Sequence, residues 1–205
     1  MAIVSGTGAN NVDQAVHNLI RYDINAIISW GTCVALVPEL KSGDLLLPEV
    51  LLADDGERYF TDKSWVERIG NSLRQERLHL HHGSMTSAQN VLINKKQKTD
   101  LHATTGALAA DMESTAIVKT ARSCGLPCIV IRAVLDEADT AIPETIMKHT
   151  DEFGKADVPG LLREIIQAPG LLVPLCELAL SLHKAVRTLK IVARRTNGTL
   201  LCPTS

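Results

Sequence analysis

Short apolar runs, each followed by glycine or by polar residues, recur along the first half of the chain. Runs of this kind predict β-strands, and we expect strands at residues 2–5, 26–29, 45–52 and 79–82. Apolar residues recur at helical spacing after the first run and again at residues 64–73, where Ser64 is a candidate N-cap. Residues 85–100 are polar and predict a loop. The pattern therefore indicates strands that alternate with helices.

The segment from residue 107 to residue 143 predicts a strand, a helix and a second strand. A short apolar run at 108–110 leads to Asp111, a favourable N-cap for a helix over 112–124 that Gly125 ends. The β-branched run at 128–135 is typical of a strand buried on both faces. A unit of this kind crosses over with a right-handed connection into a parallel sheet. The last third of the chain is helical and is divided at Pro169.

Together these elements indicate an α/β fold, a three-layer sandwich with a mostly parallel central sheet, formed by residues 1–205 as one domain. The net charge of -2 gives no reason to expect a nucleic-acid surface. Cationic residues near the C-terminus follow a helical pattern and indicate a solvated helix face. There is no signal-peptide pattern and no apolar stretch of about 18 residues, so we expect a cytoplasmic protein without a stable membrane span.

The cysteines and histidines do not indicate a disulfide framework or a metal site. Five cysteines at irregular spacing do not indicate a disulfide framework. The histidine-rich run at residues 79–82 has no nearby cysteine or carboxylate in the sequence, so a half-exposed strand explains it better than a metal site. We therefore expect no metal.

Candidate chemistry collects at the carboxyl ends of the predicted strands, where open parallel sheets bind ligands. Glycine turns that contain Gly8 and Gly31 follow the first two strands. Glu113 follows the strand before the helix, and Asp136 closes the strand after it. The predicted crossover places these two carboxylates at one edge, where they suit unlike roles. Taken singly, each has a simpler explanation, such as a tight turn, a favourable charge at a helix start or a cap.

Residues 110–114 (Ala-Asp-Met-Glu-Ser) and 131–139 (Ile-Arg-Ala-Val-Leu-Asp-Glu-Ala-Asp) together resemble the paired signature of the purine nucleoside phosphorylase and methylthioadenosine nucleosidase superfamily. The turns at residues 5–8, 31–32 and 43–44 match that superfamily's glycine turns. The resemblance runs from about Ile3 to Pro143 and is most specific from Gly106 onward. It implies a nucleoside phosphorylase-like fold and an enzyme that cleaves N-glycosidic bonds.

The resemblance also implies roles for individual residues. Asp136 would be the general acid that protonates N7 of the departing purine, and Glu113 would bind the 2′ and 3′ hydroxyls of the ribose. An aspartate at this position suits a 6-amino purine, so adenine is the favoured base. The remaining substrate-binding residues that the resemblance implies are Met112 against the sugar, Asp111, and Val91 and Leu92 around the base.

Gly8, Gly31 and Thr32 would lie on the side of the nucleophile, which is water in the nucleosidases and phosphate in the phosphorylases. The resemblance suggests no metal or organic cofactor, and phosphate is a candidate co-substrate. It implies a small-molecule nucleoside as the ligand, no nucleic acid and a homo-oligomeric assembly.

A narrower resemblance involves residues 105–107 (Thr-Gly-Ala) and the segment from Asp157 through the leucine-rich C-terminal helices. Both are similar to the hopanoid-associated phosphorylase group, which is linked to the removal of adenine from adenosylhopane. That nucleoside carries a large apolar 5′ substituent, which the leucine-rich helices would shelter. The simpler explanation of each leucine is that the helices cover the sheet.

Two features depart from the superfamily's pattern. Its members begin with one or more additional strands, which supply groups on the nucleophile side, and we expect this chain to lack them; no arginine lies near Gly6 or Gly31 in the sequence. Val34 stands where relatives have further glycines. These departures leave open a catalytically impaired nucleoside-binding paralog and a truncated methylthioadenosine/adenosylhomocysteine nucleosidase. A dinucleotide binder would require a third glycine and an acidic residue where Asn11 and Ser29 stand.

Overall fold

The computed structural model describes residues 21–22, 24–141, 168–198 and 200–203. The strand expected at residues 2–5, the turn that contains Gly8 and the helix expected after it lie outside these ranges. The described elements, in chain order, are β1 (Ile27–Ala35), β2 (Leu45–Leu52), β3 (Arg58–Phe60), α2 (Lys63–Ser72), β4 (Leu80–Ser87), α3 (Lys95–Thr105), β5 (Ala109–Asp111), α4 (Ser114–Ser123), β6 (Cys128–Asp136), the 3-10 turn η1 (Pro169–Leu171) and α7 (Leu172–Arg195).

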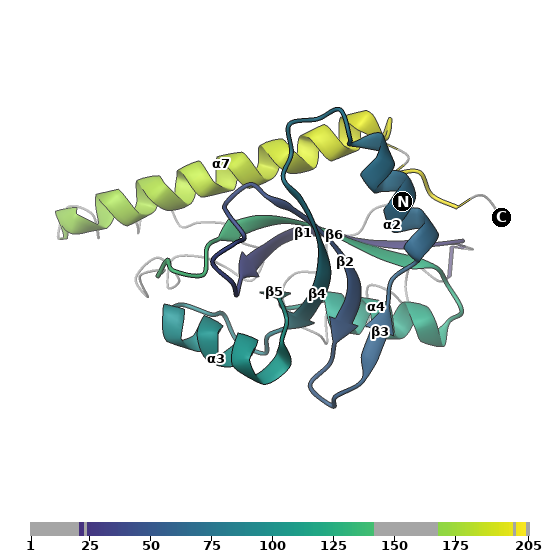
Figure 1. Ribbon diagram of the computed structural model, residues 1–205, viewed down its shortest axis with the longest axis horizontal. Coiled ribbons are helices and arrows are strands. Elements are labelled where there is room, and N and C mark those ends of the chain that lie inside the picture. Colours follow the sequence, from purple (N-terminus) through teal and green to yellow (C-terminus); the bar gives the residue numbers. More distant parts are fainter. Residues whose placement is uncertain (1–20, 23, 142–167, 199, 204–205) are drawn as a thin grey trace.

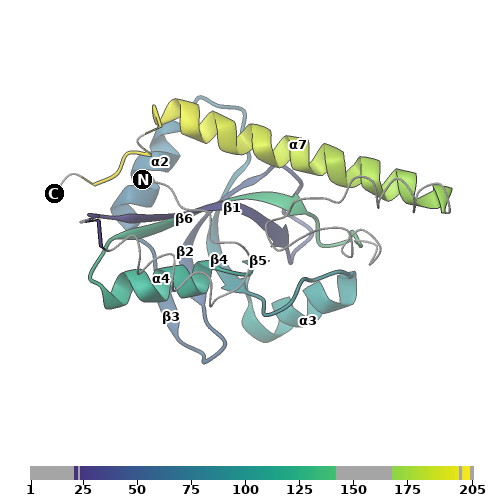
Figure 2. The same cartoon turned by 180° about the vertical axis from the view of Figure 1, so that it is seen from behind.

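The described strands form one sheet in the order β3-β2-β4-β5-β1-β6, and an additional pairing of β2 with β6 closes it. The pairs β1–β6, β2–β4 and β4–β5 are parallel, whereas β2–β3, β1–β5 and β2–β6 are antiparallel. α7 lies along one side of this sheet, and α3 and α4 lie on the other (Figure 1; Figure 2). The α/β class is confirmed. The prediction of a mostly parallel sheet is wrong, because the sheet is mixed and closed.

The closure depends on β2, which pairs along both of its edges. Leu45 pairs with Leu80 of β4 and also with Ala133 of β6. The register with β4 then shifts between Pro48 and Val50, where the proline has no N–H to donate. Twist and irregularity of this kind bring the two edges of a sheet together, and hydrophobic periodicity does not reveal them.

The connection from β5 through α4 to β6 is not the parallel crossover that the sequence predicted. β5 lies on one side of β1 and runs antiparallel to it, whereas β6 lies on the other side and runs parallel to it. β5 has only three residues, and it pairs with just Val34 and Ala35 of β1. The pattern of apolar residues predicted these elements but not the direction in which the short strand enters the sheet.

Alternate residues of the central strands pack into two cores on opposite faces of the sheet. Leu46 of β2 and Val130 of β6 pack on the α4 face, and Leu47 and Ile131 pack on the face that α2 and α7 cover. In β6 every residue except Leu135 is buried. The prediction of a strand buried on both faces is therefore confirmed.

Helix α2 begins one residue earlier than predicted, and Asp62 caps it instead of Ser64. The carboxylate of Asp62 accepts the backbone N–H of Trp65 at 2.7 Å, and the hydroxyl of Ser64 donates to the same carboxylate at 2.8 Å. Two neighbouring polar residues were both suitable caps by type. The structure selects Asp62, and the helix that follows buries Trp65 and Ile69 fully in the core.

Helix α4 begins at Ser114, two residues later than predicted. Asp111, the last residue of β5, still accepts the N–H groups of Glu113 at 3.2 Å and Ser114 at 3.0 Å. Gly125 follows the helix with a φ of 67°, in the left-handed region that ends helices at little cost. The predicted N-cap is wrong, because Glu113 and not Asp111 occupies that position, whereas the predicted terminator Gly125 is confirmed.

The loop predicted over residues 85–100 is wrong, because β4 extends to Ser87 and α3 begins at Lys95. Asn94 accepts the N–H of Gln97 at 3.0 Å, and the side chain of Gln97 accepts the N–H of Asn94 at 3.3 Å. This capping box and the left-handed Gly106 bound the helix. Both signals are present in the sequence. The helix is polar at nearly every position, so apolar periodicity does not show it.

Strand β1 continues past the end predicted for it, so Gly31 and Thr32 lie inside a strand and not in a turn. Gly31 pairs with Arg132 of β6, and a bulge follows between Cys33 and Val34. Neither Gly31 nor Val34 has a positive φ. The conformational penalty expected for Val34 in a glycine turn therefore does not arise.

Helix α7 packs the second half of its length against the sheet, where Ala185, Thr188 and Val192 are buried. Its first half projects beyond the sheet and exposes Leu172 and Leu180 (Figure 1; Figure 2). Pro169–Arg195 is long and apolar enough to cross a membrane by length and composition, with a mean hydropathy of 1.2 in an 18-residue window. One such helix is weak evidence for a span.

Candidate functional site

Asp136 and the segment at residues 111–113 come together at the end of β1. Val34 of β1 pairs with Ala110 of β5 on one side and with Asp136 of β6 on the other. Because neighbouring strands lie about 4.8 Å apart, the backbones of Ala110 and Asp136 are about 10 Å apart. The two parts of the sequence signature are therefore close in space. Their shared partner Val34 achieves this, and not a parallel crossover.

The carboxylate of Asp111 is occupied by donors from the protein itself. Arg132 Nε donates to Oδ2 at 2.9 Å, Ser114 Oγ donates to the same oxygen at 2.5 Å, and Ser87 Oγ donates to Oδ1 at 3.0 Å. Both side chains of the Asp111–Arg132 ion pair are 4% exposed. Asp111 thus fixes the backbone that leads into Glu113 and α4. A direct contact of Asp111 with substrate stays a prediction.

Met112 and Glu113 lie between β5 and α4, and both are half-buried. Glu113 occupies the N-cap position of α4, with φ of -132° and ψ of -30°. Its backbone N–H is held by the carboxylate of Asp111. The expected contacts of these two residues with ribose stay predictions.

Arg132 lies beside Gly31, although the sequence showed no arginine near that glycine. A Cβ atom on Gly31 would lie 3.4 Å from Arg132 Nη1, so the absence of a side chain leaves room for the guanidinium. Arg132 Nη2 donates to Ser29 Oγ at 2.6 Å and Ser114 Oγ at 2.8 Å, and Nη1 donates to the carbonyl of Ile131 at 3.1 Å. With Nε donating to Asp111, four of the five N–H groups of the guanidinium have partners among the described residues.

The structure describes only some of the residues predicted to lie near the nucleophile. Thr32 is half-buried on β1, whereas Gly8 lies outside the described residues. Burial raises the pKa of the neighbouring Cys33 thiol to about 12, against the opposing effect of the Arg132 charge. A thiol in this environment stays protonated and is not a nucleophile at neutral pH. The roles of Gly8, Gly31 and Thr32 stay predictions.

Asp136 is 5% exposed at the end of β6 and is held by two side chains. The ammonium of Lys98 lies 2.6 Å from Asp136 Oδ2, and the hydroxyl of Thr140 donates to Oδ1. Lys98 belongs to α3, the helix that the sequence pattern did not reveal. This buried ion pair was therefore missed, although the capping box at Asn94 and Gln97 was a signal for the helix.

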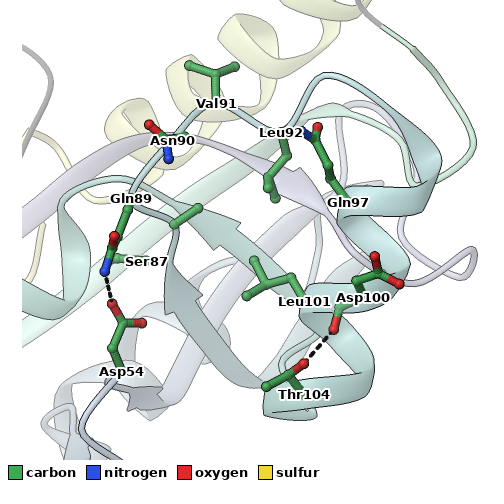
Figure 3. A pocket seen from close by; sticks show the side chains of 11 residues that line it. Asp54, Ser87, Gln89, Asn90, Val91, Leu92, Gln97, Asp100, Leu101 and Thr104 are labelled. Atoms are coloured by element: carbon green, nitrogen blue, oxygen red, sulfur yellow. Dashed lines mark hydrogen bonds between the residues drawn. The ribbon is translucent and has the colours of Figure 1, made fainter.

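A pocket of about 510 Å³ lies at the carboxyl ends of the parallel strands β2 and β4, beneath α3 (Figure 3). It contains Val91 and Leu92, the residues predicted to surround the base, and Gln89 reaches across to Asp54 with a hydrogen bond of 3.0 Å. The other lining residues are Ser87, Ala88, Asn90, Gln97, Asp100, Leu101 and Thr104.

The pocket and the carboxylates are linked through Ser87, although neither Glu113 nor Asp136 lines the pocket. Ser87 lines the pocket wall, and its hydroxyl donates to Asp111 and accepts the backbone N–H of Thr115 at 3.0 Å. The pocket volume lies within the usual range for small-molecule sites, about 300–1,000 Å³.

Within the part of the chain that the structure describes, no group of three or more His, Cys, Asp or Glu side chains could hold a metal ion. His81 of the histidine-rich strand lies 2.9 Å from Asp44 Oδ2 through its Nε2 atom. The described cysteines are all free thiols.

Comparison with known families matches residues 1–159 to the Phosphorylase superfamily. A 5′-methylthioadenosine/S-adenosylhomocysteine nucleosidase of Staphylococcus saprophyticus is 26% identical over 153 residues, which cover 66% of this chain and 67% of that protein. The corresponding protein of Staphylococcus aureus strain Newman is 23% identical over 157 residues, covering 67% and 69% of the two chains.

Solved structures agree with this match. The structure of the nucleosidase of the same name from S. pneumoniae, bound to a transition-state inhibitor, has a TM-score of 0.61 at 25% identity and covers 66% of each chain. Futalosine hydrolase of Helicobacter pylori has a TM-score of 0.70 at 18% identity, covering 94% of this chain and 76% of the other. The chain spans about two thirds of the length of the nucleosidases that it matches in sequence.

Proposed function

Because the chain belongs to the Phosphorylase superfamily, a family of enzymes, we propose that it cleaves the N-glycosidic bond of an adenine nucleoside. The observation that carries the proposal is the pairing of Val34 with both Ala110 and Asp136, which brings residues 111–113 and Asp136 together. The similarity to 5′-methylthioadenosine/S-adenosylhomocysteine nucleosidases supports the same reaction class.

The two carboxylates suit the two halves of the substrate. Breaking the bond leaves a ribosyl centre with oxocarbenium character and an electron-rich purine. Protonation of N7 by Asp136 as the bond stretches would accelerate departure by about 10²–10⁴-fold. Glu113, at the start of α4, would accept hydrogen bonds from the ribose hydroxyls, and Met112 would pack against the sugar.

The base is assigned to the pocket beneath α3. Val91 and Leu92 supply apolar surface there, and Gln89 and Asn90 supply amide groups that can pair with the edge of a purine. Adenine is favoured because an aspartate can donate to N7 and also accept from the exocyclic amine.

Water is the favoured nucleophile. Among the described residues, Arg132 is the arginine beside Gly31, and its guanidinium is already engaged by Asp111, Ser29 and Ser114. A phosphate co-substrate needs cations whose hydrogen bonds are available to it. Phosphorolysis remains the alternative, and the yield of ribose 1-phosphate against free ribose distinguishes the two.

An apolar 5′ substituent, as in adenosylhopane, is the finer part of the proposal. The first half of α7 exposes Leu172, Leu180 and Leu182, which would favour contact with such a group. A substrate with a small 5′ substituent, such as a methylthio group, would not use this surface.

A second candidate function is purine binding without cleavage. Asp136 Oδ2 is buried, and Asp136 does not line the pocket. A base that entered the pocket without reaching Asp136 would bind and not be cleaved.

The test is release of adenine from adenosines with methylthio and long alkyl 5′ substituents, in the presence and absence of phosphate. We expect release by the wild-type protein and a rise in KM with Glu113→Gln, because the amide loses the acceptor pair for two hydroxyls. Binding of adenine with no release from any substrate would instead establish the binding function.

A further inference from the structure

Lys98 is the one residue of helix α3 that is buried, and its side chain is 0% exposed. Its ammonium donates to the carbonyl of Glu137 at 2.6 Å and to the carbonyl of Thr140 at 2.8 Å, and lies 2.6 Å from Asp136 Oδ2. The lysine thus joins α3 to the end of β6 and to the backbone just beyond it.

The contact between Lys98 and Asp136 is ionic. The ammonium lies 2.6 Å from Asp136 Oδ2, and both side chains are buried, so the two groups form a close ion pair. The ammonium has three N–H groups, and two of them are directed to the carbonyls of Glu137 and Thr140. The third N–H group is left for Asp136 Oδ2, which lies at 2.6 Å.

A fully buried lysine needs compensation, because removing an ammonium from water is costly unless it is paired and hydrogen-bonded. Every other charged residue of α3 is exposed: Lys95, Lys96 and Asp100. Lys95 pairs with Asp139 and Lys96 with Asp100 at the surface. If position 98 only had to fill space in the interior, an apolar residue would be more stable there. Packing alone therefore does not explain the charged side chain of Lys98.

We propose that Lys98 is a positioning residue for Asp136, a role that rests on the proposed function. The ammonium of Lys98 holds Oδ2 in place, while the hydroxyl of Thr140 holds Oδ1. Lys98 also anchors the backbone at Glu137 and Thr140, so the carboxyl group presented to the base is held on both sides.

The position of Lys98 links this carboxyl group to the base pocket. Gln97 and Leu101 of α3 line the pocket, and Figure 3 shows both in its wall. One helix therefore carries the wall that would contact the base and the ammonium that orients Asp136. A change in the position of α3 would therefore affect the pocket wall and the alignment of Asp136 together.

The first test compares Lys98→Met with Lys96→Met, which removes an exposed ammonium from the same helix. In steady-state adenine release, we expect Lys98→Met to lower kcat about 10²-fold, as misplacement of a catalytic group by about 1 Å does, with KM changed less than about threefold. Lys96→Met should stay within about twofold of the wild type.

If wild-type protein releases no adenine, the proposed function fails and this role fails with it. If the wild type is active and the two methionine variants are equal, only the role of Lys98 is overturned.

The second test asks whether Lys98 acts through Asp136. Adding Lys98→Met to Asp136→Asn should leave the residual release rate of Asp136→Asn unchanged, whereas a general structural role would lower it further.

Thermal unfolding covers the case in which Lys98→Met folds poorly. The double variant has no unpaired buried charge, so its unfolding midpoint should exceed that of Lys98→Met alone. A double variant that is as unstable as Lys98→Met, or less stable, would overturn the assignment.

Discussion

The guanidinium of Arg132 organises the polar interior at the end of the sheet. It contacts Asp111 through two nitrogens and also donates to Ser29 and Ser114, so residues from β1, β5, α4 and β6 share one hydrogen-bond network. Asp111 in turn holds the N–H of Glu113. The ion pair therefore acts on the candidate site by fixing the backbone that carries Glu113.

Breaking this pair should destabilise the protein strongly. Arg132→Met leaves the carboxylate of Asp111 buried and unpaired, which costs about 3–5 kcal/mol of unfolding free energy. The double variant Arg132→Met with Asp111→Asn should recover part of that loss, because no buried charge remains. Urea denaturation measures both, with the exposed Arg68→Met as the control. Equal stability of Arg132→Met and Arg68→Met would contradict the role of the pair.

The sequence predicted Asp111 and Glu113 at a functional edge but not what Arg132 does. The contact between Arg132 and Gly31 follows from the register of β1 with β6, which joins positions that are 101 residues apart. Local pattern carries no information on such a register. The absence of an arginine near Gly31 in the sequence therefore did not exclude one beside it in the fold.

Capping residues fix the first residue of helices α2 and α3. α2 depends on a single carboxylate at Asp62, and α3 depends on the reciprocal bonds of Asn94 and Gln97. In each case a polar residue that satisfies the first N–H groups fixes where the helix begins.

Substitution at the two candidate caps of α2 should separate them. Asp62→Ala removes the acceptor for the N–H of Trp65 and should lower the free energy of unfolding by about 1 kcal/mol. Ser64→Ala removes a hydroxyl inside the first turn and should change it by less than about 0.5 kcal/mol. Chemical denaturation of the two variants checks this. A larger loss in Ser64→Ala would restore the original prediction of the cap.

How much of an element could be predicted depended on its polarity. β6 is apolar at most positions, and its burial was predicted correctly from the run at 128–135. α3 is mostly polar, so its existence depended on the capping box and on Gly106, and Lys98 was missed with it. The direction of β5 could not be predicted, because three residues in a strand specify neither a partner nor an orientation.

At the scale of the molecule, closure of the sheet removes several polar and reactive groups from water. Cys33 on β1 and Cys128 on β6 are both buried, and burial raises the pKa of each thiol to about 12. The ordinary value is 9.0, so both thiols remain protonated in the folded state at a pH where they ionise in the unfolded chain.

These two buried thiols should lower the free energy of unfolding at alkaline pH. A folded-state pKa above the unfolded value means that the stability is present below about pH 9 and is lost as the pH rises toward the folded value. The loss is at most about 1.4 kcal/mol per thiol for each pH unit above the unfolded value. Denaturation of a Cys33→Ala, Cys128→Ala variant at pH 8 to 10.5 should show a flatter alkaline limb. Cys124→Ala, which replaces an exposed thiol, is the control. An equally flat pH dependence in this variant would contradict the role of the buried thiols.

From the family match and the register at Val34 we propose that Asp136 protonates the departing adenine. The most direct measurement is the rate of adenine release from a 5′-substituted adenosine by wild-type protein, Asp136→Asn and Asp139→Asn. Asp139 lies three residues further along, is exposed and pairs with Lys95 at the surface, so it is a matched control. We predict that Asp136→Asn lowers kcat by about 10²–10⁴-fold and that Asp139→Asn retains nearly full activity. Equal rates for the wild type and Asp136→Asn would contradict the claim.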